Sequence, residues 1–381
     1  MTCGVMKNAV AMLSSRERDV VIDRLRGVSI LVVLIGHFHN AYNLATNLRG
    51  LPRSLLLPLV LENEHYGVVA FFTISGYLIT SNTLRRYGSF GSINALGFYL
   101  FRFARITPCL LLFVLMVAVF EAIGIPRFNL GNDNVAGYLA VASAFLFFHN
   151  VLIIHFGWFS YCLNILWSIS IEEAFYFGYP LVMLALRHTR FVQAACVALI
   201  LAGPLHRFFT SQHAAQYYCF LSCFDAIAFG ILAAISVHAG RRDPRTARML
   251  RIGGACILIL VSIAKAEVGL TLGVSAIALG TAMILLATQP VEQLSRRSVR
   301  VVSWFGSRSY ELYLFHIVVL ALMRAVAGPG TIVIAWRPVW LLLFLLLAAL
   351  VAAVISNGFS NPANLAIRQL FANRVRVAST V

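Results

Sequence analysis

Apolar stretches of about 20 residues recur along nearly the whole 381-residue chain, separated by short segments that carry most of its charges. An α-helix of this length is what a chain needs to cross the ~30 Å hydrocarbon core of a bilayer. Hydrophobic residues make up 60% of the chain and charged residues only 12%, against roughly 45–50% and about 25% in soluble domains. The sequence therefore predicts an all-α, polytopic membrane helical bundle and excludes an ordinary soluble enzyme.

Ten of these stretches are predicted to cross the membrane, and an eleventh, 137–156, is ambiguous. The ten lie near 27–45, 67–84, 108–125, 166–186, 191–206, 217–239, 252–266, 268–288, 304–325 and 338–356. Without a span at 137–156, 23 of the 30 Lys and Arg residues share the cytoplasmic side, and with it 14 of them leave that side. We therefore predict ten spans with both termini cytoplasmic. The segment 137–156 is then re-entrant or an extra segment on the outer face, one use of which is a lid; a short tilted span is the alternative.

No linker, low-complexity tract or internal repeat divides the chain. A single transmembrane domain is expected over residues 1–356, followed by a short cytoplasmic tail at 357–381. The expected location is the cell inner membrane. The net charge of +16 then faces anionic headgroups, so membrane lipid and no nucleic acid is the expected partner. Only Lys7 and Lys265 among the basic residues are lysines, and this excess of Arg indicates a phosphate-bearing ligand.

Two histidines lie deep in predicted spans, where an ionisable group costs several kcal/mol unless it is paired or hydrated. His37 follows Arg26 by 11 residues, which places it roughly 15 Å along its helix. His316 lies at a depth of about 18 Å by the same rise. Both are candidate functional residues; the alternative for His37 is a neutral core histidine bonded to a backbone carbonyl.

Two further polar residues map to a similar depth. Glu172 lies in WSISIEEAFYFGYP with Tyr176 one turn later on the same helix face, and Ser75 lies in FFTISGYLI. Adjacent carboxylates cannot share one face, so Glu173 is expected to point elsewhere, for example to cap a helix start. Because His37, His316, Ser75 and Glu172 share the central or outer half of the bilayer, the sequence predicts one internal pocket.

The segment FYLFRFARITP places Arg102 and Arg105 on one face of a helical turn at the cytoplasmic side, with Pro108 opening the third span. Two guanidiniums on one face can clamp phosphate, or they can be ordinary topological anchors. A buried histidine near a carboxylate or Arg can act as general base on a hydroxyl or can carry an acyl group covalently. A proton relay in a transporter would use the same residues.

Five short motifs follow one another between about residues 22 and 316. They are IDRLRGVSILVVLIGH, GVVAFFTISGYLIT, FYLFRFARITP, WSISIEEAFY and YELYLFH. In this order they resemble the motifs of the membrane-bound acyltransferase 3 family, bacterial multi-pass O-acyltransferases that act on glycans. The resemblance implies transfer of an acyl group, usually acetyl, from cytoplasmic acyl-CoA to a hydroxyl of a carbohydrate or glycolipid such as O-antigen or exopolysaccharide.

The same resemblance assigns roles to particular residues. It implies that His37 is the catalytic residue, with Arg26 as its motif partner and Glu172 as a second catalytic candidate. Arg102 and Arg105 match positions that handle acyl-CoA. The remaining expected substrate-binding residues are Ser75, Trp167, Tyr176 and His316. Acyl-CoA is a co-substrate, no cofactor is expected to be bound, and no metal is expected because His37 and His39 point to different faces of their helix.

One position departs from the family pattern. Many members carry an acidic residue where this chain has Val69, so its carboxylate is absent or comes from Glu62 or Glu64. Residues that select the acceptor are expected in the outer loops near 46–66, 126–165 and 207–216. The alternative function is a multi-pass transporter or flippase with His37 and Glu172 as a proton relay, although no inverted repeat is found.

Overall fold

The computed structural model describes residues 20–45, 61, 63–240, 242–263, 269–288 and 297–378. Throughout this part the secondary structure is helical and no strand occurs, as predicted. The helices are α2 (Val20–Tyr42), α4 (Glu64–Tyr87), α5 (Ala95–Ala122), α6 (Gly137–Phe145), α7 (His149–Phe156), α8 (Leu166–Leu186), α9 (Thr189–Phe209), α10 (His213–Tyr218), α11 (Phe220–Ala239), α12 (Pro244–Ile263), α14 (Val274–Leu286), α15 (Arg297–Ser307), α16 (Ser309–Val326), α17 (Arg337–Ile355) and α18 (Asn361–Ala378).

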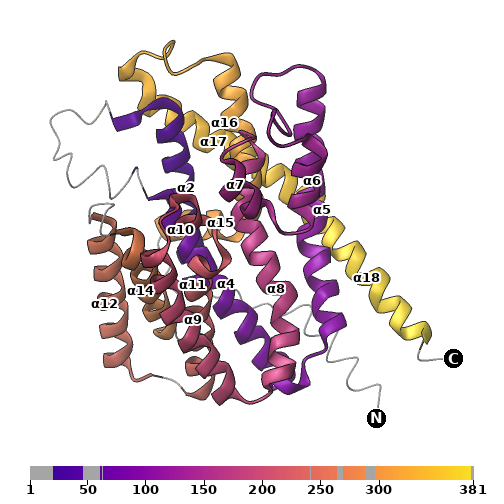
Figure 1. Cartoon of the computed structure of the whole chain (residues 1–381), viewed down its shortest axis with the longest axis vertical. Coiled ribbons are helices and arrows are strands. Elements are labelled where there is room, and N and C mark those ends of the chain that lie inside the picture. The colour runs from indigo at the N-terminus through magenta and orange to yellow at the C-terminus, as the bar shows by residue number, and fades with distance from the viewer. Residues whose placement is uncertain are drawn as a thin grey trace.

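Each of the ten predicted spans corresponds to a helix of the bundle (Figure 1). Within the described residues, eight helical segments are long and apolar enough to cross a membrane. Two predicted spans are not among them: α14 is shorter, and α2 carries the polar residues His37, His39 and Asn40 in its last turns. The predicted spans 252–266 and 268–288 each extend at one end into residues outside the described part. Residues 1–19 and 46–60 also lie outside it, and with them most of the predicted outer loop 46–66.

The segment 137–156 is not a continuous span. It forms α6 and α7, of nine and eight residues, separated at Phe147, whose backbone has a left-handed φ of 62°. Because a spanning helix needs about 20 residues, neither helix can cross the bilayer. The loop after α7 then leads into α8, and this loop supplies side chains to the pocket described below.

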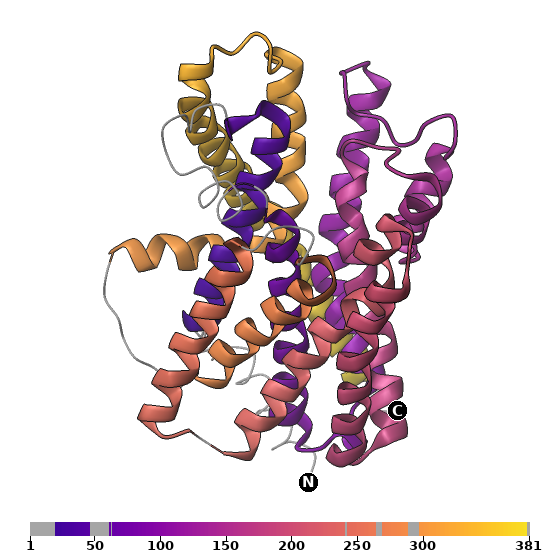
Figure 2. The ribbon, with the colours of Figure 1, turned by 60° about the vertical axis from the view of Figure 1, so that its left-hand side comes forward.

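Two predicted helix boundaries are wrong. Pro108 does not open the third span but lies inside α5, which begins at Ala95, where Asn94 Oδ1 accepts a hydrogen bond from the Gly97 amide at 2.9 Å. An N-cap of this kind satisfies an end amide, and an interior proline is tolerated in membrane helices. The predicted span 304–325 breaks at Arg308 into α15 and α16, and α15 runs across the long direction of the bundle (Figure 2).

The centre of the bundle is the crossing of α4 with α11, where two glycines let the backbones touch. A Cβ atom on Gly230 would overlap the carbonyl oxygen of Thr73, and one on Gly76 would overlap that of Ile227. Small residues drive close helix packing in membranes because lipid offers no hydrophobic gain from burying larger ones. This contact fixes α4, which carries residues of both polar layers described below.

We expect Gly230→Ala to destabilise the protein because the added methyl group has no space at this crossing. Overpacking of this kind costs about 1–3 kcal/mol. Gly178→Ala is the matched control, since nothing lies within 4 Å of the place that the new methyl group would take on α8, and alanine is the better helix former. Thermal unfolding in detergent should show a lower Tm for Gly230→Ala alone; equal Tm values for both variants would contradict the close crossing.

Candidate active site

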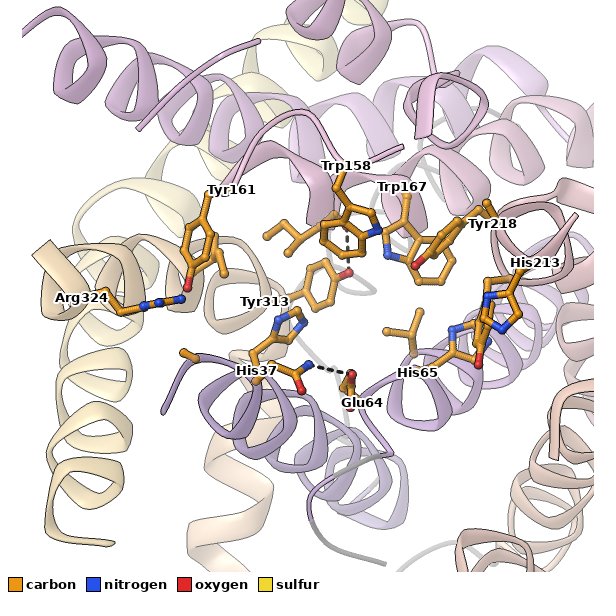
Figure 3. A pocket seen from close by; sticks show the side chains of 17 residues that line it. His37, Glu64, His65, Trp158, Tyr161, Trp167, His213, Tyr218, Tyr313 and Arg324 are labelled. Carbon is orange, nitrogen blue, oxygen red and sulfur yellow. Dashed lines mark hydrogen bonds between the residues drawn. The ribbon is translucent and has the colours of Figure 1, made fainter. Parts of the chain in front are cut away.

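A cavity of about 510 Å³ opens between α2 and α16 on one side and the α7–α8 loop and α10 on the other. Its size is that of a small-molecule site. Figure 3 shows His37 and Glu64 on one wall, Trp158 and Trp167 on the opposite wall, and Arg324 at one end. The lining also includes Asn40, His65, Tyr161, His213, Tyr217, Tyr218 and Tyr313.

His37 lies beside His316 and Glu64. The two imidazole rings are 5.0 Å apart between centroids, and the Glu64 carboxylate acts electrostatically on His37. Nδ1 of His316 is 3.0 Å from the carbonyl oxygen of Leu312. This bond makes Nδ1 the protonated nitrogen. The buried Nε2, which has no hydrogen-bond partner among the described residues, is then an acceptor.

The Glu64 carboxylate is held in place at the first turn of α4. Its Oε1 accepts a hydrogen bond from Asn40 at 3.0 Å, and its Oε2 is buried with no partner in the part of the chain that the structure describes. A Cβ atom on Gly36 would lie 2.7 Å from Oε2, so the carboxylate packs directly on the α2 backbone next to His37. Glu64, one of the two residues proposed to replace the acid missing at Val69, therefore supplies a carboxylate at the pocket.

Aromatic rings form the opposite wall. Trp167 stacks on His65 at 5.6 Å and meets Tyr218 edge-on at 4.9 Å between centroids. Trp167 is 6% exposed, whereas Trp158 is 58% exposed and lies at the mouth of the pocket. Flat apolar faces with polar tips suit a ligand that has both apolar C–H faces and hydroxyls.

Ser75 and Glu172 form a second polar layer with three arginines, which we call the arginine cluster: Arg26, Arg102 and Arg105. The Ser75 hydroxyl donates a hydrogen bond to Glu172 Oε1, and all three guanidiniums lie within electrostatic range of that carboxylate. The Arg102 guanidinium lies 3.6 Å from the centroid of the Tyr176 ring, and the Tyr176 hydroxyl is 3.5 Å from Glu172 Oε1.

The prediction of one pocket for His37, His316, Ser75 and Glu172 is therefore wrong. The structure brings together His37 with His316, and separately Ser75 with Glu172. Of these four residues, His37 lines the cavity and the other three do not. Five residues separate Glu172 from Trp167, which is about 7.5 Å along α8. That rise is enough to place the carboxylate in the next layer, toward the arginines of α2 and α5.

The arginine cluster extends to residues that the sequence analysis did not select. Arg86 at the end of α4 and Arg368 of α18 both lie over the ring of Phe101, at 4.4 and 4.9 Å. Arg368 also interacts electrostatically with Arg105. The cluster thus draws on α2, α4, α5 and α18, at the end of the bundle where α4 ends and α5 begins (Figure 1).

A buried ion pair supports the α10 wall of the pocket. Arg207 of α9 donates hydrogen bonds from its two terminal nitrogens to the two carboxylate oxygens of Asp225 of α11, at 2.7 and 3.3 Å. Both side chains are fully buried. The guanidinium also bonds Ser275 at 2.6 Å and the carbonyl of Thr271 at 3.1 Å. Gln216 of α10 in turn donates to the carbonyl of Arg207 at 3.0 Å.

Several lining residues were missed by sequence reasoning, yet their positions carried a signal. The lining residues Glu64, His65, Trp158, Tyr161 and His213 all come from the outer segments 46–66, 126–165 and 207–216, where acceptor selection was expected. Tyr313 lies three residues before His316 and so shares its helix face. Arg324 is one of the few basic residues predicted on the outer side.

A family model described as an acyltransferase domain matches residues 19–357, nearly the whole of the described helical part. The chain belongs to the acyltransferase 3 family. Both polar layers lie within the matched residues, apart from Arg368 of the arginine cluster's extension. The domain boundary expected at residue 356 stays a prediction; the residues 361–378 beyond it form α18.

Two curated relatives of this acyltransferase 3 chain are O-acetyltransferases. It is 25% identical over 335 residues to the peptidoglycan O-acetyltransferase OatA of Listeria monocytogenes, covering 82% of this chain and 51% of the relative. It is likewise 25% identical to the O-acetyltransferase OatA of Staphylococcus aureus strain NCTC 8325, covering 82% and 52%. The chain thus spans about half the length of these relatives. No solved structure matches it significantly.

We expect single replacements in the Arg207–Asp225 pair to be more harmful than the double replacement. Removing one partner leaves an unpaired buried charge, which costs about 3–5 kcal/mol, whereas an apolar pair of similar volume avoids that cost. Thermal unfolding in detergent should rank Arg207→Met and Asp225→Leu below the double variant. A double variant less stable than both would show that the two charges do not act as a pair.

Proposed function

We propose that this chain is a membrane O-acyltransferase that moves an acyl group, acetyl in the first instance, from acyl-CoA to a hydroxyl of a carbohydrate or glycolipid. The observation that carries the proposal is the position of His37, beside a carboxylate in a sugar-sized cavity, in a chain whose acyltransferase match covers residues 19–357. The names of the O-acetyltransferase relatives support the acetyl group and the glycan acceptor.

In the proposed step His37 is the general base. A ring nitrogen of His37 takes the proton of the acceptor hydroxyl while the hydroxyl oxygen attacks the thioester carbonyl carbon of acyl-CoA. The new C–O ester bond forms, the C–S bond breaks, and the proton passes to the leaving CoA sulfur. Glu64 stabilises the imidazolium that exists between these two transfers, as a nearby carboxylate does for a catalytic histidine.

The arginine cluster is proposed to hold the donor. Acyl-CoA carries several phosphates, and Arg binds phosphate with two parallel hydrogen bonds. In the predicted topology both termini lie on the cytoplasmic side of the inner membrane. The arginine cluster would then face the cytoplasm, which contains acyl-CoA. The pantetheine arm would then extend past Glu172 and Ser75 toward His37, with the acceptor entering from the aromatic side of the cavity.

Acyl transfer is favoured over a proton relay by the separation of the two polar layers. A relay through His37 and Glu172 needs them linked by hydrogen bonds, but Glu172 bonds Ser75 and Tyr176, and the carboxylate next to His37 is Glu64. Release of free CoA thiol by the purified chain in the presence of glycan is the measurement that separates the two functions.

We expect His37→Ala to lower acyl transfer by about 10²–10⁴-fold, the usual contribution of a general base, without loss of folding. The measurement is CoA thiol release, together with mass spectrometry of surface glycans from the native host complemented with each variant. His238→Ala is the matched control, because His238 is an exposed histidine in the last turn of α11.

A folded His37→Ala variant with activity near that of the wild type would overturn this mechanism. Denaturing mass spectrometry of the wild type, quenched during turnover, tests the covalent route. An acyl adduct on His37 would replace general-base catalysis by an acyl carrier, and its absence is expected.

We expect Arg102→Ala and Arg105→Ala to raise the apparent KM for acyl-CoA about 10-fold or more, since each removes a charge-assisted phosphate contact. The KM for the acceptor should stay near the wild-type value. Arg190→Ala, which removes an exposed arginine at the start of α9, serves as control. If both KM values were unchanged in the Arg102 and Arg105 variants, the pair would serve only as topological anchors.

A further inference from the structure

We propose that the end of the cavity lined by Tyr161 and Arg324, with the exposed Arg127 beside Tyr161, binds a negatively charged substituent of the acceptor glycan. We call this end the anion subsite. The ligand chemistry is a carboxylate or a phosphate ester close to the hydroxyl that is acylated. This inference rests on the proposed function, because it specifies the acceptor for the same pocket.

Two guanidiniums converge on one tyrosine at this end. Arg324, in the last turn of α16, lines the cavity, and its guanidinium carbon is 6.0 Å from the Tyr161 ring centroid. Arg127, in the loop after α5, lies 5.7 Å from the centroid of the same ring. Tyr161 itself lines the cavity, and Figure 3 shows its side chain and that of Arg324 next to each other.

Neither guanidinium has a carboxylate partner within the described part of the chain, where Arg207–Asp225 is the buried ion pair. The Nε atom of Arg324 is buried and makes no hydrogen bond there. Arg324 is half-buried at the cavity wall, where its guanidinium hydrogen-bonds the Tyr161 side chain but meets no anion among the described residues, and an anionic ligand would lower the cost of that charge. Arg127 is exposed and adds positive charge beside the same ring. Arg also presents two parallel donors that match the oxygens of a carboxylate or phosphate.

The position of these arginines in the bundle is unusual for basic residues of a membrane protein. Arg127 follows α5, and Arg324 lies in the last turn of α16. Both helices finish at the end of the bundle opposite the arginine cluster (Figure 1). Basic residues normally concentrate on the cytoplasmic side. The helix dipole explains why α16 tolerates a cation in its last turn, but it does not explain why Arg324 faces the cavity.

The geometry of the cavity connects this end with the proposed chemistry. Figure 3 places His37 between Arg324 on one side and the ring of His65 on the other, opposite Trp158 and Trp167. A sugar ring packed on the indoles can present a hydroxyl to His37 while a charged substituent reaches Arg324. A neutral sugar would leave Arg324 without an anion at this end of the cavity.

The experiment uses the full chain in lipid nanodiscs, radiolabelled acetyl-CoA and glycans extracted from the native host. The labelled products are separated by anion exchange, and the label should enter the anionic fraction. The acceptor is then used in two further forms, treated either with carbodiimide and an amine to neutralise carboxylates or with phosphatase to remove phosphate monoesters. The treatment that lowers transfer by the wild type identifies the charged group.

Variants of Arg324 test whether the negative charge of the acceptor is bound at the anion subsite. Arg324→Gln should raise the KM for the untreated acceptor at least 10-fold with a smaller change in kcat, and Arg324→Lys should recover part of the loss. On the neutralised acceptor the wild type and Arg324→Gln should have similar KM values. Arg300→Gln, which removes an exposed arginine of α15, is the control for lost charge, and thermal unfolding checks folding.

The possible failures are distinct. Transfer into neutral glycans only, or equal loss by Arg324→Gln on charged and neutralised acceptors, would overturn the anion subsite and leave the proposed function intact. No transfer by the wild type into any glycan would overturn the proposed function, and this inference with it.

Discussion

The cost of placing ionisable side chains in a lipid-embedded bundle determines how this protein is built. Such groups must meet partners or water inside the protein, because hydrocarbon offers neither. The chain meets this requirement in three places: the cavity with His37 and Glu64, the arginine cluster around Glu172, and the buried Arg207–Asp225 pair. Within the described residues, Glu64 Oε2 at the cavity is buried without a hydrogen-bond partner, whereas Arg207 and Asp225 bond each other.

Two helices connect the layers and so set the distance between the cavity and the arginine cluster. The first turns of α4 carry Glu64 and His65 at the cavity, and Ser75 follows in the second layer. In the same way α8 carries Trp167 at the cavity and Glu172 about 7.5 Å further along its axis. Because α4 is locked against α11 by the glycine crossing, the spacing of the layers is a property of rigid helices and not of loops.

The sequence was sufficient to predict the helical membrane fold and the absence of a continuous span at 137–156. It also grouped His37 with His316, but in one pocket that included Ser75 and Glu172. Hydropathy and loop charges act over whole helices, so they survive errors of a few residues in each boundary. The same boundary errors defeated the single-pocket prediction. An error of a few residues changes the expected depth of a side chain by several Å, which is as large as the rise along α8 from Trp167 at the cavity to Glu172 in the second layer. Residues such as Trp158 and Arg324 come to line one cavity only through tertiary folding, and residue spacing along a single helix carries no information about that.

The contact between Gly36 and Glu64 ties two positions that are far apart in the sequence. A side chain larger than glycine at position 36 and a carboxylate at position 64 compete for the same space, since a Cβ atom on Gly36 would lie 2.7 Å from the Glu64 oxygen. Neither position can therefore change freely during evolution while the other is kept.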